Sequence, residues 1–574
     1  MQNKAMQSRA MQNNTKLKPI LSALLFAYAS IGYSQLTLAG AVQTPDAGII
    51  LQQTEPVLPA EPASNETGLE REVPADAVDS KPFSVSSIRI SGNTLFESAV
   101  LHDLVKDAEG TSQTLLQVKA LANRITDYYR NEGYPLSRAV IPQQSIENGM
   151  VQIQVIEARL GEVSIENTSR VSDTLIESTA KQLTAGEAIV QESLERTLLL
   201  LNDLPGTNIS ANLNAGKVGG STDLNVSATP TPMIAGRVTL DGYGNRFINR
   251  ERVGASVSVF NPLGLGDVLS LSVITTGKRM QYGLIDYNLA LNGYGTRLGA
   301  SYGALHYELG DEIAALRAHG QAQTGDLWLR HPFIRAAKHN LYGTVKYNYA
   351  DLEDRVDAAF IKNDRHVKTW SGILNGDFRD GVFGGGTNSM SIQFTNGQVK
   401  FDDPIAEIAD SVTANTDGSF SKWNINLNRL QAINAKTSLW LSISGQIAED
   451  NLDSSQKMVF GGPFSVRAYD TGAISGDNGV LGTIELRRNL GNFHGLIQGI
   501  AFADIGQVRV NKKLWAAATG DNRASLSGMG MGVNWFGNNQ WAAKASAATS
   551  TGSRADLTKD ADNTIAWMEI SKGF

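Results

Sequence analysis

One stretch of the sequence matches the G-x-S-x-G pattern of a nucleophilic serine. It covers residues 299–303, with Ser301 at its centre. The pattern supports catalysis where a strand turns sharply into a helix, because that turn exposes the serine hydroxyl. Here the flanking residues alternate between apolar and polar types, as in a continuous strand. A hydrolase that uses Ser301 is therefore only an alternative function, and no enzymatic activity is expected.

The residue types that hold metals and cofactors do not form the patterns that such sites require. The chain has no cysteine, and its 7 histidines show no spacing such as H-E-x-x-H. Residues 264–267, Gly-Leu-Gly-Asp, lack the third glycine and the following helix of a dinucleotide-binding loop. A net charge of −7 offers no basic surface to nucleic acid. We expect no metal, no cofactor and no nucleic-acid partner.

Two charged residues in the C-terminal half have the types needed for a strong ion pair. Arg467 lies in a loop, whereas Asp504 lies in an alternating stretch with Phe502 and Gly506. By the two-residue period of a strand, Phe502, Asp504 and Gly506 share one face. A guanidinium and a carboxylate in a confined space form a bidentate, charge-assisted contact. Sequence spacing alone leaves open whether Arg467 and Asp504 meet.

A long series of alternating strands surrounds these residues. It begins after Pro232, with clear alternation in residues 234–241 and 252–260. The polar face carries Arg, Asp and Gly, which is typical of a water-filled lumen, and residues 232–574 suffice for about 16 strands, an even number. The chain ends in an alternating strand whose last residue is Phe574, as the closing strand of an outer-membrane barrel usually does. We predict a membrane β-barrel of antiparallel strands, closed because no edge is tolerated in lipid.

The first 82 residues predict three segments without a hydrophobic core. Residues 1–41 combine a basic start, a short apolar run and Ala39-Gly40-Ala41, as in a signal peptide. Residues 42–56 predict one short helix on which Ile49, Ile50 and Gln53 share a face. Residues 57–82 are rich in proline and acidic residues and predict an extended linker. Because so short a helix is marginal alone in water, we expect it to dock into another part of the molecule.

Two similar α+β units lie between the linker and the barrel. Residues 83–157 and 158–231 each predict one strand, two helices and two further strands. Tandem copies of one unit favour an interaction module over a catalytic domain.

Together these features resemble the transporters of two-partner secretion, the TpsB family within the Omp85 superfamily. The resemblance covers essentially the whole mature chain. It is carried by residues 194–206 in the second unit, by residues 462–469, which look like the family's VRGY loop motif, and by residues 502–506, which look like its FxDxG strand motif. The loop motif departs at Ala468, where the family usually has glycine, and the change narrows the backbone choices there. The motif residues are Val466, Arg467, Ala468 and Tyr469 in the loop and Phe502, Asp504 and Gly506 in the strand.

The resemblance implies a function and a set of partners. The two units would be periplasmic POTRA domains that capture the secretion domain of a large exoprotein, and exposed sheet edges make strand addition the natural mode. The helix at 42–56 would plug the lumen beside an inward loop at about 455–480, in which Arg467 and Asp504 form a gating pair. The barrel-assembly machinery would recognise Phe574, and outer-membrane lipid would surround the barrel. We expect the outer membrane of a Gram-negative bacterium, with both units in the periplasm.

Several alternatives stay open at this point. An insertase of the same superfamily generally carries a different number of repeats and no tethered helix, and a passive porin needs no periplasmic repeats. The client is open among a haemolysin, an adhesin, a haem scavenger and a contact-dependent inhibition toxin. Of these we expect the toxin or a large adhesin.

Overall fold

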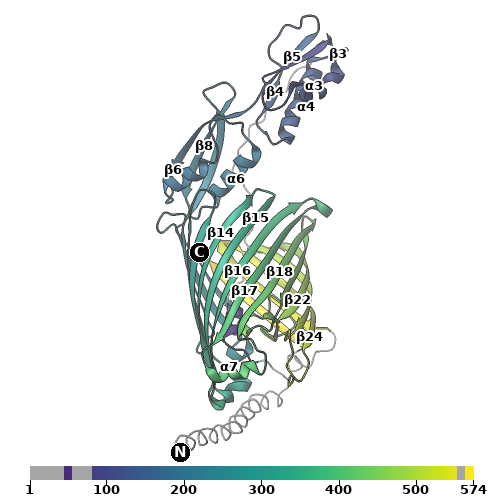
Figure 1. Ribbon diagram of the computed structural model, residues 1–574. Helices are drawn as coiled ribbons and strands as arrows, with labels where there is room; N and C mark the ends of the chain where they lie inside the picture. Colours follow the sequence, from purple (N-terminus) through teal and green to yellow (C-terminus); the bar gives the residue numbers. More distant parts are fainter. Residues whose placement is uncertain (1–43, 55–80, 552–562) are drawn as a thin grey trace, which may run out of the picture.

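The computed structural model describes residues 44–54, 81–551 and 563–574. The signal peptide expected at 1–41 and nearly all of the expected linker lie outside the described residues. The largest part of the structure is a barrel, with two small α+β units stacked at one end (Figure 1). Within the described ranges no helix is long and apolar enough to cross a bilayer.

The barrel consists of 16 antiparallel strands that pair in chain order, and the last strand returns to the first. The prediction of a closed 16-strand barrel is therefore confirmed. Closure matters because every backbone N–H and C=O group facing lipid needs an internal partner. The strands are β9 (Ile234–Asp241), β10 (Arg252–Phe260), β11 (Val268–Thr275), β12 (Met280–Ala290), β13 (Arg297–Glu308), β14 (Ala318–Arg335), β15 (His339–Val356), β16 (Ile361–Asp380), β17 (Gly386–Phe401), β18 (Gly418–Asn434), β19 (Thr437–Ala448), β22 (Asn478–Asn492), β23 (Gly495–Arg509), β24 (Arg523–Gly537), β25 (Trp541–Ser550) and β26 (Thr564–Gly573).

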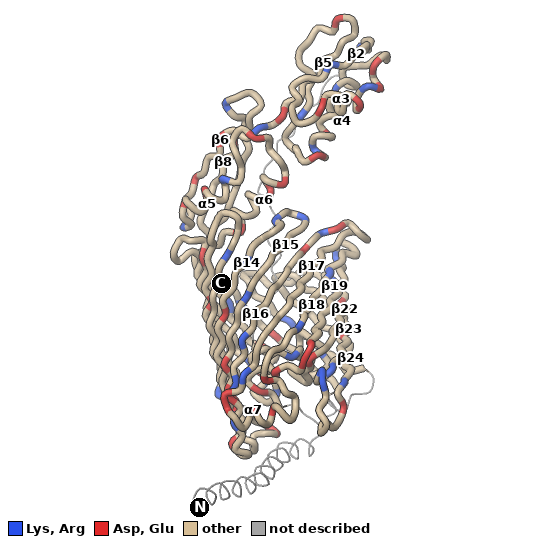
Figure 2. The backbone as a smooth tube through the Cα atoms, in the orientation of Figure 1, with Lys and Arg blue, Asp and Glu red and all other residues tan. Residues whose placement is uncertain are grey.

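Alternate side chains of each strand face outward and inward. The outward residues are apolar and exposed, for example Leu240, Val273 and Ile505. The inward residues include buried charged groups such as Arg365 and Glu485. An apolar outer face and a polar lumen are what a lipid-embedded barrel requires. Acidic and basic residues are dense at the end of the barrel that carries the loop helix α7 (Pro404–Ser411) (Figure 2).

The seam between β26 and β9 is the shortest pairing in the barrel. Only 5 residue pairs join these strands, whereas 9 join β25 to β26 and 8 join β9 to β10. The C-terminal residue extends the seam, because Phe574 and Gly236 exchange two backbone hydrogen bonds of 3.0 Å. The Phe574 ring also covers the bare Cα of Gly236, and a Cβ added to Gly236 would lie 2.3 Å from the ring.

Both α+β units contain a three-stranded sheet, built from one strand before the two helices and two strands after them, which is the element order expected from the sequence. In the first unit β2 pairs parallel to β5 and β4 pairs antiparallel to it, and in the second β6 and β7 pair with β8 in the same way. The first unit adds a small β1–β3 sheet that the sequence did not predict. The first unit comprises β1 (Phe83–Val85), β2 (Ser87–Ser91), α3 (Ser98–Asp103), β3 (Thr111–Gln113), α4 (Leu115–Asn131), β4 (Arg138–Val140) and β5 (Met150–Ile156), and the second comprises β6 (Arg159–Asn167), α5 (Asp173–Ala180), α6 (Gln191–Asn202), β7 (Thr207–Ala215) and β8 (Ser221–Pro230).

Candidate functional site

A short helix, α2 (Ala47–Thr54), lies inside the barrel and falls within the segment predicted as a plug. Ile49 and Ile50 of the predicted face are buried, and Gln53 is half-buried. Ile50 and Leu51 belong to the same buried cluster as lumen-facing residues of strands β12 to β19. The helix therefore has an apolar docking surface on the barrel wall, which an isolated helix of eight residues needs in order to form.

The start of the helix is fixed by one arginine of the wall. Arg365 on β16 is only 1% exposed and contacts three carboxylates. Its Nε donates to Asp453 at 2.5 Å, its Nη1 donates to Asp354 at 2.7 Å, and its Nη2 donates to Asp46 at 3.1 Å. Asp46 precedes α2, Asp354 belongs to β15 and Asp453 belongs to the loop after β19. One guanidinium thus joins the helix, the wall and the inward loop.

The carboxyl of Asp46 also caps α2 and is electrostatically strained. Its Oδ1 accepts a hydrogen bond of 3.0 Å from the backbone N–H of Ile49, as a helix N-cap does. Burial raises the pKa of Asp46 from 3.8 to about 6; Arg365 opposes the rise, and the carboxylates of Asp354 and Asp453 add to it. A single cation cannot neutralise three carboxylates, so the site favours a proton on Asp46.

The loop between β19 and β22 packs against the inner face of the barrel wall. It contains a two-stranded sheet of β20 (Met458–Phe460) and β21 (Ile474–Gly476). Val466, Ala468 and Tyr469 are at most 1% exposed, and they pack with wall residues of β23, β24 and β25. The loop also meets α2, because the Gln53 side chain lies over the bare Cα of Gly472.

The structure brings Arg467 and Asp504 together. The Arg467 Nε and Nη2 each donate to one oxygen of the Asp504 carboxylate at 2.8 Å, which is a bidentate contact. The Cζ of Arg467 lies 3.3 Å from the centroid of the Phe502 ring, a cation–π contact. Its Nη1 donates to Glu485 on β22 at 2.5 Å. Arg467 is thus held on three sides by two adjacent strands of the wall.

The remaining motif residues provide space for the loop. A Cβ on Gly506 would lie 2.9 Å from Phe460 and 3.1 Å from Val466, so only glycine lets the loop approach β23 this closely. Ala468, which replaces the family's usual glycine, has no positive φ. Its methyl group lies against Gly528, and a Cβ added to Gly528 would come within 2.4 Å of that methyl group. The backbone at Ala468 therefore does not require glycine, and the bare Cα of Gly528 accommodates the methyl group.

The loop also bridges the two sides of the barrel seam. Trp567 on β26 donates its indole N–H to the carbonyl oxygen of Arg467 at 2.8 Å. On the other side, the Thr471 hydroxyl donates to the carbonyl oxygen of Tyr243, just beyond β9, at 2.9 Å. The rings of Tyr243 and Trp567 pack edge to face at 6.1 Å. The loop therefore joins the first and last strands where their own pairing has ended.

Sequence reasoning missed Arg365, Glu485 and Trp567. Glu485 alternates with apolar residues on β22 and is the register partner of Phe502, so alternation together with strand pairing was an available signal. Arg365 carries no local signal, because its partners lie 319, 11 and 88 residues away in sequence. Trp567 was recognised only as part of the closing strand.

Ser301 does not have the surroundings of a nucleophile. It lies in the middle of β13 and pairs with Asp286 and Asp326 on the neighbouring strands. Its hydroxyl donates to Asp326 at 3.1 Å. The strand continues through Gly303 without a turn into a helix, so the context that the motif needs is missing.

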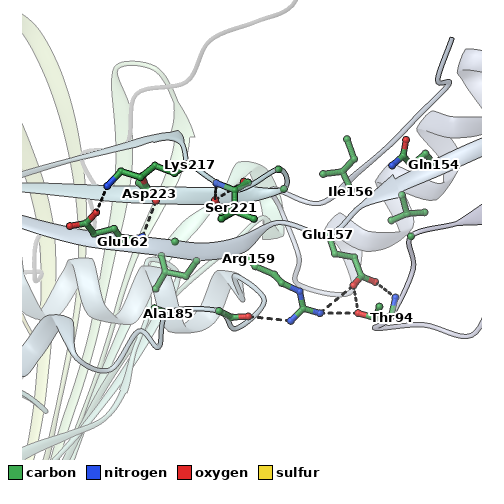
Figure 3. Close-up of a pocket in the computed structure, with 18 residues that line it drawn as sticks. Thr94, Gln154, Ile156, Glu157, Arg159, Glu162, Ala185, Lys217, Ser221 and Asp223 are labelled. Carbon is green, nitrogen blue, oxygen red and sulfur yellow. Dashed lines mark hydrogen bonds and ion pairs between the residues drawn. The ribbon is translucent and has the colours of Figure 1, made fainter.

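A pocket of about 890 Å³ lies at the junction of the two α+β units (Figure 3). Arg159 connects the units there, since it donates to the Thr94 hydroxyl at 2.9 Å and to the carbonyl oxygen of Gly186 at 3.2 Å. The ends of β5 and β6 and the hairpin at 216–220 line the remainder. The side chain of Val218 at the hairpin tip is 72% exposed.

A closed barrel with an internal helix, an inward loop and two tandem units at one end defines a protein-transport pore of the outer membrane. Residues 220–535 match the family described as "Haemolysin secretion/activation protein ShlB/FhaC/HecB", and residues 83–158 match "POTRA domain, ShlB-type". The chain belongs to this haemolysin secretion/activation family.

Individual relatives agree with this assignment. The chain is 28% identical over 478 residues to the heme/hemopexin transporter protein HuxB of Haemophilus influenzae, covering 83% of this chain and 84% of the relative. It is 24% identical to the outer membrane transporter CdiB of Escherichia coli, covering 76% of each chain. The solved structure of CdiB from Escherichia coli superposes with a TM-score of 0.68 at 20% identity, covering 88% of this chain and 93% of that one.

The protein is therefore an outer-membrane transporter of two-partner secretion that exports a partner exoprotein, as the sequence predicted. Its two α+β units are periplasmic. The barrel rim next to these units is the periplasmic rim, and the opposite rim with α7 faces outward (Figure 1). The insertase and porin alternatives are not supported by these relatives.

Proposed function

We propose that the protein is a normally closed export pore in which α2 and the inward loop block the lumen until the client binds. The observation that carries this proposal is the contact of Arg365 with Asp46, Asp354 and Asp453. Because this contact joins the helix, the wall and the loop, loss of one partner destabilises the other two. The client's arrival would release the helix, shift the loop and let the exoprotein pass.

The direct test is conductance of the purified full chain in planar bilayers. Deletion of residues 42–56 is expected to raise the conductance, because the lumen loses its helix. The matched control replaces residues 63–77 by a Gly-Ser stretch of equal length and keeps the helix. Unchanged conductance after the deletion would exclude a plug role for α2.

The pair of Arg467 and Asp504 is proposed to hold the loop in its closed position and to guide its movement during export. Both side chains are at least nine-tenths buried, so removal of one leaves a buried charge without its partner. Arg467→Ala and Asp504→Ala are expected to impair secretion while the protein stays assembled in the membrane. Arg509→Ala, on the same strand as Asp504, is the control. Normal export by both variants would remove the pair from the mechanism.

Client capture is proposed to occur on the POTRA domains by strand addition. β7 is an edge strand of its sheet, and an edge offers unpaired backbone groups to an extended chain. Photo-crosslinking from positions on β7, with positions on the central strand β8 as controls, tests this mode during export of the partner. Crosslinks from β8 alone would contradict it.

The client is proposed to be a haem-binding or hemopexin-binding exoprotein. This proposal differs from the toxin or adhesin expected from the sequence. It is supported by the higher identity and coverage of the heme/hemopexin transporters than of the CdiB transporters. The test is haem absorbance of the exoprotein that disappears from the culture medium when the transporter gene is deleted. A secreted toxin without haem affinity would contradict it.

A further inference from the structure

Residues 194–206 of the second POTRA domain carry much of the family resemblance but have no part in the plug. They lie against the periplasmic rim of the barrel. Glu195 accepts a hydrogen bond of 3.0 Å from the backbone N–H of Ala337, and Arg196 donates to the carbonyl oxygen of Pro332 at 2.9 Å. The structure therefore gives this stretch a specific partner, the turn between β14 and β15.

One ion pair dominates the contact. Arg335, at the end of β14, donates through Nε and Nη2 to both oxygens of Asp203, each at 2.8 Å. The Arg335 side chain has no exposed surface, and Asn340 accepts a third hydrogen bond from it at 3.2 Å. An irregular register between Pro332 and Ile334 precedes it, and such a bulge redirects the following side chain. A planar guanidinium fixed in this way determines orientation as well as distance.

Two further turns of the rim complete the contact. Ser172 donates its backbone N–H to Gly264 at 2.9 Å, and Gln182 donates to Gly293 at 2.8 Å. A Cβ on Gly293 would lie 2.4 Å from the backbone of Ser178, so the turn and α5 touch directly. These turns connect β10 to β11 and β12 to β13. The second POTRA domain is thus fixed at three successive turns.

All three turns lie between β10 and β15, on one side of the barrel. Figure 1 shows the second POTRA domain above this side, while the rim above β17 and β18 is uncovered. The turns at 381–385 and 493–494 on the uncovered side carry Phe383 and Phe493, which are 89% and 67% exposed. The periplasmic mouth is therefore half covered, and the covered half is set by the contact around Arg335.

We propose that Asp203 and Arg335 are positioning residues for export: their ion pair fixes the second POTRA domain over the β10–β15 half of the mouth, so that the unfolded client reaches the lumen through the uncovered half. The inference rests on the export activity and is independent of the plug. A change in the pair alters where captured client is presented, not the pore itself.

The test compares Asp203→Arg, Arg335→Asp and the double exchange in the full chain. Because the chain has no cysteine, cysteines placed at Glu195 and Ala337 allow the contact to be measured by a short bismaleimide crosslinker. Each single exchange is expected to reduce both the crosslinking yield and secretion of the partner at least tenfold, since like charges then face each other. The double exchange restores the ion pair and is expected to recover both to within about threefold. Resistance of the barrel to heating in detergent is expected to be the same in all variants.

Two results would overturn the proposal. One is normal secretion by a single exchange whose crosslinking yield has fallen. The other is an unchanged crosslinking yield in both single exchanges. Where a charge reversal prevents barrel assembly, Asp203→Asn and Arg335→Lys replace it, with the same readouts. If deletion of residues 42–56 does not alter the conductance, the plug proposal fails but the result of this test is unaffected. The two proposals can therefore be refuted separately.

Discussion

If α2 closes the pore as proposed, the cluster around Arg365 is expected to make closure depend on pH through Asp46. We predict that Asp46→Asn tightens the plug at neutral pH, although it removes a charge that contacts an arginine. Asparagine keeps the cap, because its Oδ1 still accepts from the backbone N–H of Ile49 and it caps a helix as well as aspartate does. Its amide nitrogen takes the place of the oxygen that accepts from Arg365, so that one hydrogen bond is lost. The larger effect is the removal of the third negative charge around one guanidinium.

The expected change in the docking free energy of α2 follows from the pKa of Asp46, which rises from 3.8 in the exposed state to about 6 in the docked state. Such a rise corresponds to about 3 kcal/mol between the protonated and charged forms. The side chain is still 28% exposed, so this value is an upper limit. Loss of the favourable helix-dipole interaction subtracts about 0.3–1 kcal/mol, and loss of the hydrogen bond from Arg365 subtracts about 0.5–1.5 kcal/mol more. A gain of about 1 kcal/mol in docking is left, which is about fivefold in the ratio of closed to open pores.

The same two pKa values determine whether docking of α2 becomes stronger or weaker as the pH rises. Because the docked carboxyl has the higher pKa, docking takes up a proton. This contribution is complete below about pH 4 and is lost as the pH rises through about 6. Open probability in planar bilayers is therefore expected to increase between pH 5 and 7.5 for the parent chain and to stay low for Asp46→Asn.

Asp311→Asn, in an exposed loop, is the control for loss of a carboxylate at the outer rim. Asp354, Asp453, Arg365 and Tyr307 also face the site, so any pH response left in Asp46→Asn measures their share. A pore that opens at pH 7.5 on Asp46→Asn, or a parent chain without pH response, would refute the reasoning.

Three further substitutions test other contacts. Gly48→Ala places a Cβ 2.6 Å from the backbone of Ser455, and we expect overpacking of about 1–3 kcal/mol to raise open probability in bilayers. Trp567→Phe removes the donor to Arg467 and leaves a buried carbonyl unpaired, at a cost of about 1–3 kcal/mol, so the barrel is expected to unfold at lower temperature in heated detergent gels. Deletion of Phe574 removes two backbone hydrogen bonds of the seam, and less assembled barrel is expected in outer-membrane fractions, whereas Phe574→Trp is expected to assemble normally.

The barrel was predictable because a strand with one face in lipid and one in a wet lumen must alternate, and alternation is visible in one sequence. The face of Phe502, Asp504 and Gly506 followed from the same period. That Arg467 meets Asp504 required the motifs, because a loop carries no period. The three carboxylates around Arg365 were beyond local reasoning, since long-range charge contacts leave no periodic trace. Gly528 was likewise unpredictable, because its role is only to leave room for Ala468.

The contacts that α2 and the inward loop make with the barrel join residues that are far apart in the chain. Ala47 donates to Asp354 across 307 positions, Thr471 donates to Tyr243 across 228, and Trp567 donates to Arg467 across 100. Trp567 lies only seven residues before the C-terminus. A partly inserted barrel that still lacks β26 has no indole to receive the loop and no completed wall behind it. On the proposed closed-pore mechanism, the lumen is expected to be sealed only after the last strand is in place, and a barrel without β26 is expected to leak.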